Sequence, residues 1–66
     1  MKNSLKIERA IKNLTQDDLA GLIGVSRQTI NSIEKNRYVP STILALKISR
    51  IFGKTVNEIF GLEESD

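Results

Sequence analysis

Apolar residues recur every three or four positions between Gln16 and Lys35, and polar residues fill the positions between them. This spacing places the apolar side chains on one face of an α-helix. Gly24 divides the pattern, because a helix commonly ends on a residue with positive φ, which glycine adopts without strain. The stretch therefore predicts two short amphipathic helices joined by a tight turn. Their expected inward residues are Leu19, Ala20, Ile23, Val25, Ile30 and Ile33.

Hydroxyl-bearing residues mark where the two helices of this pair begin. Thr15 precedes the first helix and Asp18 follows three places later, which predicts a capping box. Ser26 is placed to cap the second helix in the same way. Asp17 and Asp18 are interpreted as capping groups that also suit the helix dipole, rather than as catalytic or metal-binding groups.

The chain before this pair has a less regular apolar pattern. We predict a helix from about Leu5 to Asn13, with the alternative that Leu5 belongs to a short extended segment. The residues expected on its inward face, or adjoining that face, are Ala10, Leu14, Ile7 and Ile11.

Two further helices are predicted after the pair. Ser41 is placed to cap a helix that continues to about Phe52, and Gly53 ends it. Thr55 and Glu58 form a second capping box, which begins a short fifth helix. The apolar positions expected to face the core are Leu44, Ile48, Ile51 and Phe52, broadened by Ile43, Ala45 and Leu46, and then Val56, Ile59 and Phe60.

The composition narrows the classes of function. Sixty-six residues make one domain, near the lower limit for a core without disulfide or metal staples. The chain has no cysteine and no histidine, which excludes disulfides, the usual zinc sites and nucleophile–histidine catalysis. We therefore predict a protein that is not an enzyme, with no metal and no cofactor.

A membrane location is not predicted. No apolar run approaches the ~20 residues that a membrane span needs. The start of the chain carries scattered charges and lacks the apolar middle of a signal peptide. We expect a cytoplasmic protein.

Charges are distributed unevenly along the chain. The net charge is +2, yet residues 1–12 and residues 13–57 each carry +3, whereas residues 58–66 carry −4. A basic body suits a polyanionic partner, provided that the acidic end points away from it. On charge alone, an ordinary solvated surface is an equal alternative.

The second helix of the pair has a polar outer face. With its two isoleucines turned inward, the outward residues are Arg27, Gln28, Asn31, Ser32 and Lys35. Arginine can donate two hydrogen bonds to guanine O6 and N7, and glutamine or asparagine can form two with adenine N6 and N7. These side chains are therefore able to read bases. A plain solvated face is the alternative.

This layout resembles the helix-turn-helix of the short Cro/repressor-like regulators, the XRE family. The matching residues are Gln16, Leu19, Ala20, Ile23, Gly24, Val25, Ile30 and Ile33, and the likeness continues through VPST to NEIF near the end. A plain helical hairpin is the alternative, but it has no need for a small Ala20 together with Gly24 and Ser26. The resemblance implies an all-α, five-helix repressor-like domain over residues 1–66, with its reader in residues 16–35 and a short terminal β pairing allowed.

The resemblance also implies that double-stranded DNA is the partner. In the family, the second helix of the pair enters the major groove, with Arg27 and Gln28 at the first base-reading positions. Asn31 and Ser32 are expected to contribute to sequence choice. Gln16 is implied to meet a phosphate and to brace the first reading side chain. The other expected phosphate contacts are Thr29, Lys35, Asn36, Arg37 and Tyr38.

Three of these assignments have alternatives. Gln16 could merely begin a helix. Thr29 could touch a thymine methyl group instead, and Tyr38 could pack its ring on the domain. The family also joins the positions of Arg9 and Glu34 in a largely buried ion pair, which we expect to be structural here.

Apolar residues are plentiful near both ends of the chain. Leu5 and Ile7 at the front, with Phe60 and Leu62 at the back, exceed the apparent need of a core of this size, and an exposed apolar patch usually marks an interface. Related short regulators associate as two-fold dimers. The resemblance therefore implies a homodimer whose reading helices lie ~34 Å apart on an inverted-repeat operator. Its expected interface, within residues 55–66, includes Ile59, Phe60 and Leu62. The alternative is that these apolar residues simply complete the core.

The sequence therefore predicts a sequence-specific DNA-binding transcriptional regulator, with repression by promoter occlusion as the family default and activation as the alternative. A protein-interaction module, such as an antitoxin or adaptor with the same fold, is the alternative from another class. An antitoxin usually needs a toxin-wrapping segment, and few residues follow the expected fifth helix. A controller of a restriction–modification operon would be a DNA regulator in another biological setting.

Overall fold

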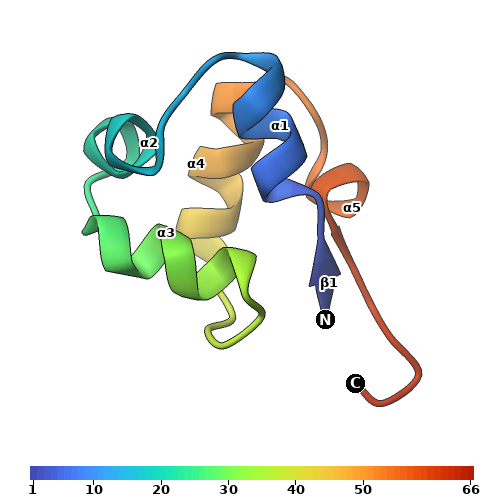
Figure 1. Ribbon diagram of the computed structural model, residues 1–66. Helices are drawn as coiled ribbons and strands as arrows, with labels where there is room; N and C mark the ends of the chain where they lie inside the picture. Colours follow the sequence, from blue (N-terminus) through green and yellow to red (C-terminus); the bar gives the residue numbers. More distant parts are fainter.

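Five helices and two short strands make up the chain, and the computed structural model describes all residues from 1 to 66. In chain order they are β1 (Lys2–Asn3), α1 (Leu5–Ile11), α2 (Gln16–Ile23), α3 (Arg27–Glu34), α4 (Thr42–Phe52), α5 (Val56–Ile59) and β2 (Phe60–Gly61) (Figure 1). The predicted all-α, five-helix architecture is confirmed, and the terminal β pairing that it allowed is present.

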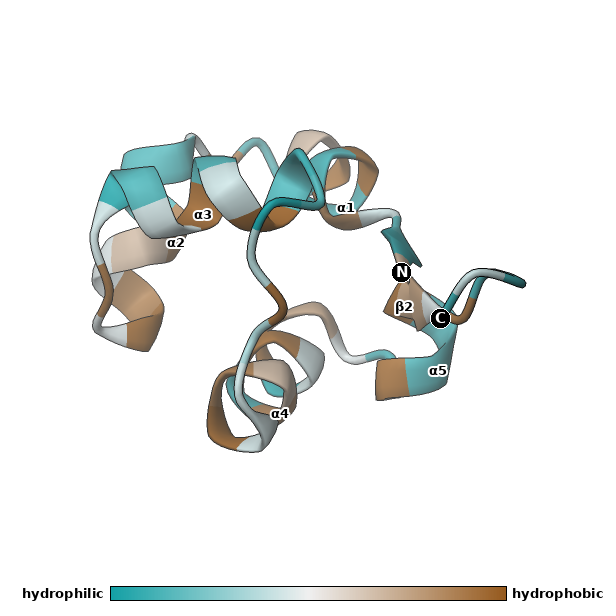
Figure 2. Cartoon of the chain, turned by 90° about the horizontal axis from the view of Figure 1, so that it is seen from below, coloured by the Kyte–Doolittle hydropathy of each residue, from teal (hydrophilic) through white to brown (hydrophobic).

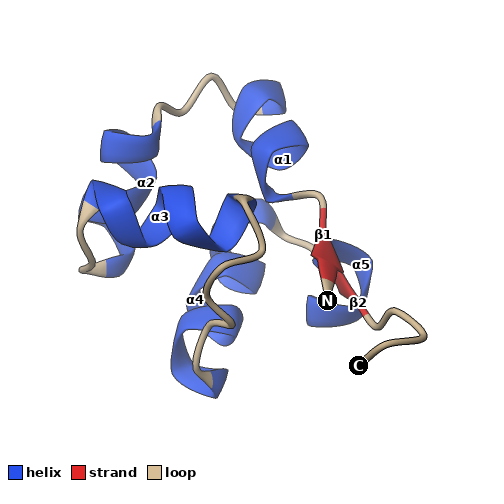
Figure 3. Ribbon diagram, turned by 60° about the horizontal axis from the view of Figure 1, so that its bottom comes forward, coloured by secondary structure: helices blue, strands red, loops and turns tan.

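The two strands join the ends of the chain. They pair antiparallel, with Lys2 opposite Gly61 and Asn3 opposite Phe60. Figure 3 shows β1 and β2 side by side next to α5. The first and last segments of the chain therefore form one end of the molecule.

The predicted capping residues begin the helices. The Thr15 hydroxyl accepts a hydrogen bond from the Asp18 N–H, and the Asp18 carboxylate accepts one from the Thr15 N–H, which completes the capping box of α2. The remaining predicted caps, also confirmed, are Ser26, Ser41 and Thr55. Gly24 and Gly53 end α2 and α4 in the left-handed region, with φ of 76° and 63°.

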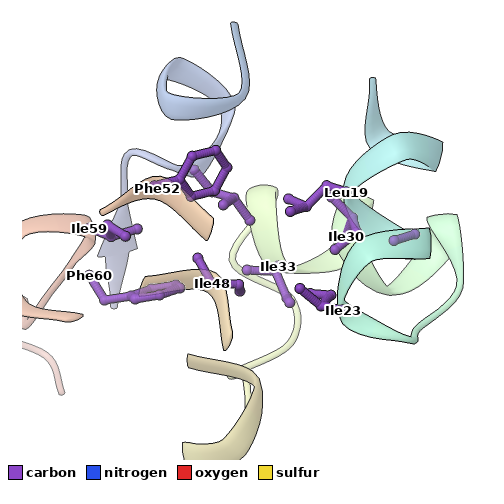
Figure 4. Packing of buried hydrophobic residues seen from close by; sticks show 10 residues of the cluster. Leu19, Ile23, Ile30, Ile33, Ile48, Phe52, Ile59 and Phe60 are labelled. Carbon is purple, nitrogen blue, oxygen red and sulfur yellow. The ribbon is translucent and has the colours of Figure 1, made fainter. Parts of the chain in front are cut away.

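The core lies between the α2–α3 pair and the end of the molecule formed by the strands and α5. Figure 4 shows Ile33 and Ile48 between the side chains of these two parts. Val25, at the corner between α2 and α3, packs against this core as predicted. The buried apolar residues are Leu5, Leu19, Ala20, Ile23, Ile30, Ile33, Ile48, Phe52, Ile59 and Phe60.

The predicted inward face of α1 is wrong for Ile7, Ala10 and Ile11, whereas Leu14, which follows the helix, packs against the core as predicted. Leu5 begins the helix rather than an extended segment, and it is buried together with Glu8. Ala10 is exposed, and Ile7 and Ile11 are 62% and 67% exposed. Of the apolar residues of α1, Leu5 alone is therefore buried.

Ion pairs explain this orientation of α1. Glu8 accepts from Lys54 at 2.8 Å (Oε2 to Nζ), and Arg9 pairs with Glu34. The hydrogen bond to Glu8 raises the pKa of Lys54 above its usual value. Two charged residues thus occupy the inner side of α1, which an apolar pattern does not reveal.

Two residues expected to broaden the apolar stripe of α4 also lie outside the core. Ile43 is 67% exposed and Leu46 is 58% exposed, whereas Ile48 is fully buried. With 3.6 residues per turn, Ile43 and Leu46 lie on the side of the helix opposite Ile48. The residues of α4 that do meet the core are Leu44, Ala45, Ile48, Ile51 and Phe52.

Candidate nucleic-acid interface

The rotation of α3 is set by its two isoleucines. Ile30 and Ile33 are 0% and 1% exposed, and they anchor one side of the helix in the core. The opposite side is polar, and Figure 2 shows hydrophilic residues along the outer side of α3. Of the five residues predicted to face outward, three are exposed and two half-buried, namely Arg27, Gln28 and Lys35, and then Asn31 and Ser32.

A recess lies on each side of the first turns of α3. The larger, of ≈ 560 Å³, is lined by Gln16, Ser26, Arg27, Gln28 and Asn31 and contains no hydrophobic residue. The smaller, of ≈ 250 Å³, is lined by Ser26, Gln28, Thr29, Ser32, Arg37 and Tyr38. Gln28 and Ser26 line both recesses, so they stand on the ridge between them. The N-terminal part of α3 therefore projects from the surface as a polar ridge.

Gln16 connects α2 to this ridge. Its side-chain Nε2 donates to Asn31 Oδ1 at 3.3 Å and to Glu34 Oε1 at 3.2 Å. Its Oε1 accepts from Arg27 Nε at 3.5 Å. The side chain of Gln16 thus joins three residues of α3, among them two predicted base readers.

The ion pair expected between Arg9 and Glu34 is present beneath Gln16. Arg9 Nε donates to Glu34 Oε2 at 2.7 Å, and a second guanidinium nitrogen donates to Oε1 at 3.1 Å. The two side chains are only 14% and 6% exposed. The hydrogen bond to Glu34 raises the pKa of Arg9. Because Arg9 also donates to the Leu14 carbonyl at 2.9 Å, the pair fixes α1 and the α1–α2 turn to α3.

The predicted phosphate contacts after α3 lie in an exposed loop. Lys35, Asn36, Arg37 and Tyr38 all have exposed side chains, and Tyr38 is 44% exposed at the edge of the smaller recess. Thr29 differs from them, because it is half-buried and its hydroxyl shares a 3.0 Å hydrogen bond with Ser26.

One residue of this region, Asn3, was not found by sequence reasoning. Its Nδ2 donates to the Ile33 carbonyl and to Asn36 Oδ1, both at 3.0 Å, and its Oδ1 accepts from the Leu5 N–H at 3.1 Å. Asn36 adopts φ of 59° at the end of α3. Asn3 thus connects β1 to the loop after α3. Its two partners at the end of α3, Ile33 and Asn36, lie 30 and 33 residues away in sequence, so no local pattern signals these contacts.

The residues predicted for a dimer interface have different surroundings. Ile59 and Phe60 are 2% and 7% exposed and belong to the core of this chain, whereas Leu62 is 81% exposed. Beside Phe60 lies a mostly apolar groove of ≈ 240 Å³. It is lined by Met1, Val39, Pro40, Thr42, Ala45, Leu46, Val56 and Phe60.

The helices are short, and the acidic side chains are dispersed. None of the helices has both the length and the apolar character needed to cross a bilayer. The acidic side chains do not gather into a group of three or more that could hold a metal ion. The two least exposed carboxylates, Glu8 and Glu34, are each paired with a cation.

Comparison with known proteins agrees with this geometry. The helix-turn-helix family model HTH_3 matches residues 5–59. The chain is 54% identical over 66 residues to MJ0272 of Methanocaldococcus jannaschii and 46% identical over 66 residues to YgzD of Bacillus subtilis. Both relatives are named as uncharacterized HTH-type transcriptional regulators, and both alignments cover 100% of each chain.

Two solved structures share the fold at 28% sequence identity. The restriction-modification controller protein C.AhdI of Aeromonas hydrophila superposes with a TM-score of 0.76, over 85% of each chain. The clp gene regulator ClgR of Corynebacterium glutamicum superposes with a TM-score of 0.74, over 82% of this chain and 57% of that one.

The fold and its polar ridge define a DNA-binding helix-turn-helix regulator, a class of proteins that are not enzymes. The chain belongs to the HTH_3 family of helix-turn-helix transcriptional regulators, of the XRE-like kind, so the resemblance predicted from the sequence is confirmed. Its partner is therefore DNA.

Proposed function

We propose that this chain is a homodimeric repressor that binds an inverted-repeat operator. The observation that carries the proposal is the two-sided structure of α3, with Ile30 and Ile33 buried and Arg27 and Gln28 projecting from a polar ridge. A helix is about 10–12 Å across with its side chains, and the major groove is about 12 Å wide, so this ridge fits the groove.

Arg27, Gln28, Asn31 and Ser32 are the proposed base-reading residues. Arg27 has the donors for guanine O6 and N7, and the Gln28 amide has the donor and acceptor for adenine. Gln28 stands between the two recesses, so it leads the ridge into the groove. Asn31 and Ser32 are half-buried one turn further on, where they meet only bases that lie close to the helix.

The proposed phosphate contacts are of two kinds. Lys35 and Arg37 are exposed cations, and such side chains supply the salt-dependent part of DNA affinity. Gln16 instead meets a phosphate through its main-chain N–H, which lies at the free N-terminus of α2, because both hydrogens of its side-chain amide are donated within the chain. The remaining proposed contacts are Thr29, Asn36 and Tyr38.

The proposed dimer contact centres on Leu62 and the apolar groove beside Phe60. Leu62 is an exposed apolar side chain that lines a recess adjoining the groove, since Met1, Val56 and Phe60 line both. Two copies can therefore each bury Leu62 against the other. Ile59 supports this surface from within the core, whereas the largely buried Phe60 also lines the groove. Two-fold association would place the two α3 helices one helical turn apart, about 34 Å, on an inverted repeat.

The acidic end of the chain lies away from the α2–α3 turn. Figure 1 shows the last residues leaving the molecule beside β1 and α5, on the other side from that turn. The Met1 ammonium group donates to Asp66 at 2.9 Å, which offsets part of the negative charge there. This arrangement supports DNA binding by the α3 face, because the carboxylates of residues 58–66 do not border it.

Selection from a random pool of duplexes tests the proposal. The full chain is mixed with the pool at low salt, bound duplexes are recovered and amplified, and the enriched sequences are aligned. A two-fold symmetric motif with half-sites about one helical turn apart is the expected result. Enrichment of a single, unrepeated half-site would contradict the dimer, and a soluble folded chain that recovers no duplex would overturn the proposal.

Repression itself needs a second measurement. A protein seated in the major groove prevents another protein from occupying the same duplex. Transcription in vitro from a promoter that overlaps the selected motif should therefore fall as the chain is added, and a promoter without the motif should be unaffected. A rise in transcription from the first promoter would identify an activator instead.

A further inference from the structure

We infer that Glu34 is a positioning residue for base reading, because its carboxylate sets which way round the side-chain amide of Gln16 is held against Arg27. The inference rests on the proposed role of Arg27 as a base reader. The largely buried Arg9–Glu34 ion pair would then affect sequence preference as well as stability.

Glu34 presents only hydrogen-bond acceptors to its neighbours. An ionised carboxylate accepts hydrogen bonds and donates none. Glu34 is held beside Gln16 by its two bonds from Arg9, at 2.7 and 3.1 Å, and its side chain is only 6% exposed. The part of the Gln16 amide that faces Glu34 must therefore be the donor Nε2, and the two atoms are 3.2 Å apart.

The position of Nε2 also determines where the oxygen of the Gln16 amide lies. When Nε2 of Gln16 faces Glu34 and Asn31, its Oε1 faces the other way, toward Arg27. Arg27 Nε donates to this oxygen at 3.5 Å. If the amide were reversed, two sets of donors would face one another, and the guanidinium of Arg27 would lose its acceptor. Glu34 thus maintains an oxygen beside the side chain that enters the groove.

Disorder of the Arg27 side chain would lower affinity. An arginine side chain has several rotatable bonds, and fixing it only on binding lowers affinity. A hydrogen bond to Gln16 limits the positions of Arg27 before DNA arrives. Loss of this bond should lower the preference for the base pair that Arg27 reads more than it lowers affinity for DNA in general.

The test compares two conservative changes at the same ion pair. Glu34→Gln keeps the size of the side chain, but it can present either a donor or an acceptor to Gln16. Arg9→Lys weakens the ion pair and leaves Glu34 as a carboxylate, so it is the matched control for stability. The probes are duplexes selected with the unchanged chain. The base pair read by Arg27 is the position at which Arg27→Ala abolishes the preference. The measured quantity is the affinity for the duplex with the preferred base pair at that position, divided by the affinity for each of the three duplexes with another base pair there.

Glu34→Gln is expected to reduce this ratio by about fivefold, within the range that one arginine–guanine contact provides. Arg9→Lys should lower the melting temperature and leave the ratio unchanged. In a Gln16→Ala background, Glu34→Gln should have no further effect on the ratio. Equal affinity losses for all duplexes in both variants, with the ratio unchanged, would overturn the inference and leave a structural role alone.

A measurement without DNA separates this inference from the proposed function. The two side-chain amide protons of Gln16 give their own signals in a nitrogen–proton NMR spectrum of the folded chain. Those signals should shift and exchange faster with solvent in Glu34→Gln than in Arg9→Lys. Unchanged signals in Glu34→Gln would overturn the positioning role even if the chain binds DNA as proposed.

Discussion

Asn3 illustrates how one polar side chain can hold distant parts of a small protein together. It bonds the Leu5 N–H, the Ile33 carbonyl and the Asn36 side chain, and so connects the terminal strands to the end of α3. Gln16 has a comparable position between α2 and α3. In a chain with only ten buried apolar residues, such contacts form a large part of what fixes the reading helix.

We predict that Asn3→Ala lowers the free energy of unfolding by about 1–3 kcal/mol, because it leaves a partly buried carbonyl and N–H without their partner. Urea unfolding followed by circular dichroism measures the change. Asn57→Ala is the matched control, since Asn57 is exposed on α5, and it should change the stability by less than about 0.5 kcal/mol. Equal effects of the two changes would mean that the Asn3 bonds contribute little in solution.

Arg27 and Arg37 offer a direct comparison between a base contact and a backbone contact. Arg27→Ala should weaken binding to selected duplexes by about 1–3 kcal/mol and relax the preference at one base pair. Arg37→Ala should weaken all duplexes alike and flatten the dependence of affinity on salt. Titrations of selected and random duplexes at several salt concentrations measure both effects. Equal losses on both kinds of duplex for Arg27→Ala would remove it from the base readers.

At the scale of single elements, the turn between α2 and α3 depends on backbone conformation. Gly24 has φ of +76°, which strains any residue with a side chain, although nothing lies within 4 Å of an added Cβ. Gly24→Ala should therefore destabilise the fold by about 1–2 kcal/mol. Gly21 lies inside α2 with equal room, and Gly21→Ala should stabilise it by about 0.4–1 kcal/mol. Thermal unfolding of both variants tests the difference in sign.

The capping box of α2 makes part of the stability depend on pH. Hydrogen bonds from the Thr15 N–H and hydroxyl lower the pKa of Asp18 below its ordinary value of 3.8. A lowered pKa in the folded state stabilises the fold above the ordinary value, and this contribution disappears as the pH falls through the lower value. Asp18→Asn should therefore reduce the free energy of unfolding at pH 7 and change it little at pH 2. Urea titrations at the two pH values measure the difference, which should be smaller for Asp17→Asn.

At the scale of the whole molecule, local signals in the sequence were sufficient for some features and not for others. Caps, glycine ends and the apolar residues of α2 and α3 depend on neighbours within a few positions, so their pattern predicted this pair of helices correctly. The orientation of α1 depends instead on Glu8 meeting Lys54, which lies 46 residues away. Family resemblance supplied the one long-range pair that was predicted, Arg9 with Glu34.

The candidate site shows the same limit. The outward residues of α3 followed from the positions of Ile30 and Ile33, because one helix has only one inner face. The bonds of Gln16 to Asn31 and Glu34 could not be predicted, since they depend on how closely α2 and α3 approach. The sequence placed Ile59 and Phe60 both on an inward face and in a dimer interface, and their burial confirms the first of these predictions.

A single charged substitution can test the proposed dimer contact. Leu62 is 81% exposed, so Leu62→Asp should leave the fold and its melting temperature nearly unchanged. If two copies bury Leu62 against each other, the charged replacement would be left desolvated in the contact, and the dimer should dissociate. Sedimentation equilibrium should then give the mass of one chain, and affinity for an inverted repeat should fall further than affinity for a single half-site.

Ile11→Asp is the matched control, because Ile11 is 67% exposed on α1, outside the groove and the terminal strands. It should preserve both the mass and the preference for the repeat. A Leu62→Asp chain that still sediments as a dimer would show that the contact lies elsewhere, and the exposed residues Val39, Ile43 and Leu46 would then be the next to test. The Leu62→Asp chain could also be monomeric in solution and still bind the repeat with undiminished affinity. In that case the two copies would assemble on the DNA, which can hold them side by side, without a dimer in solution.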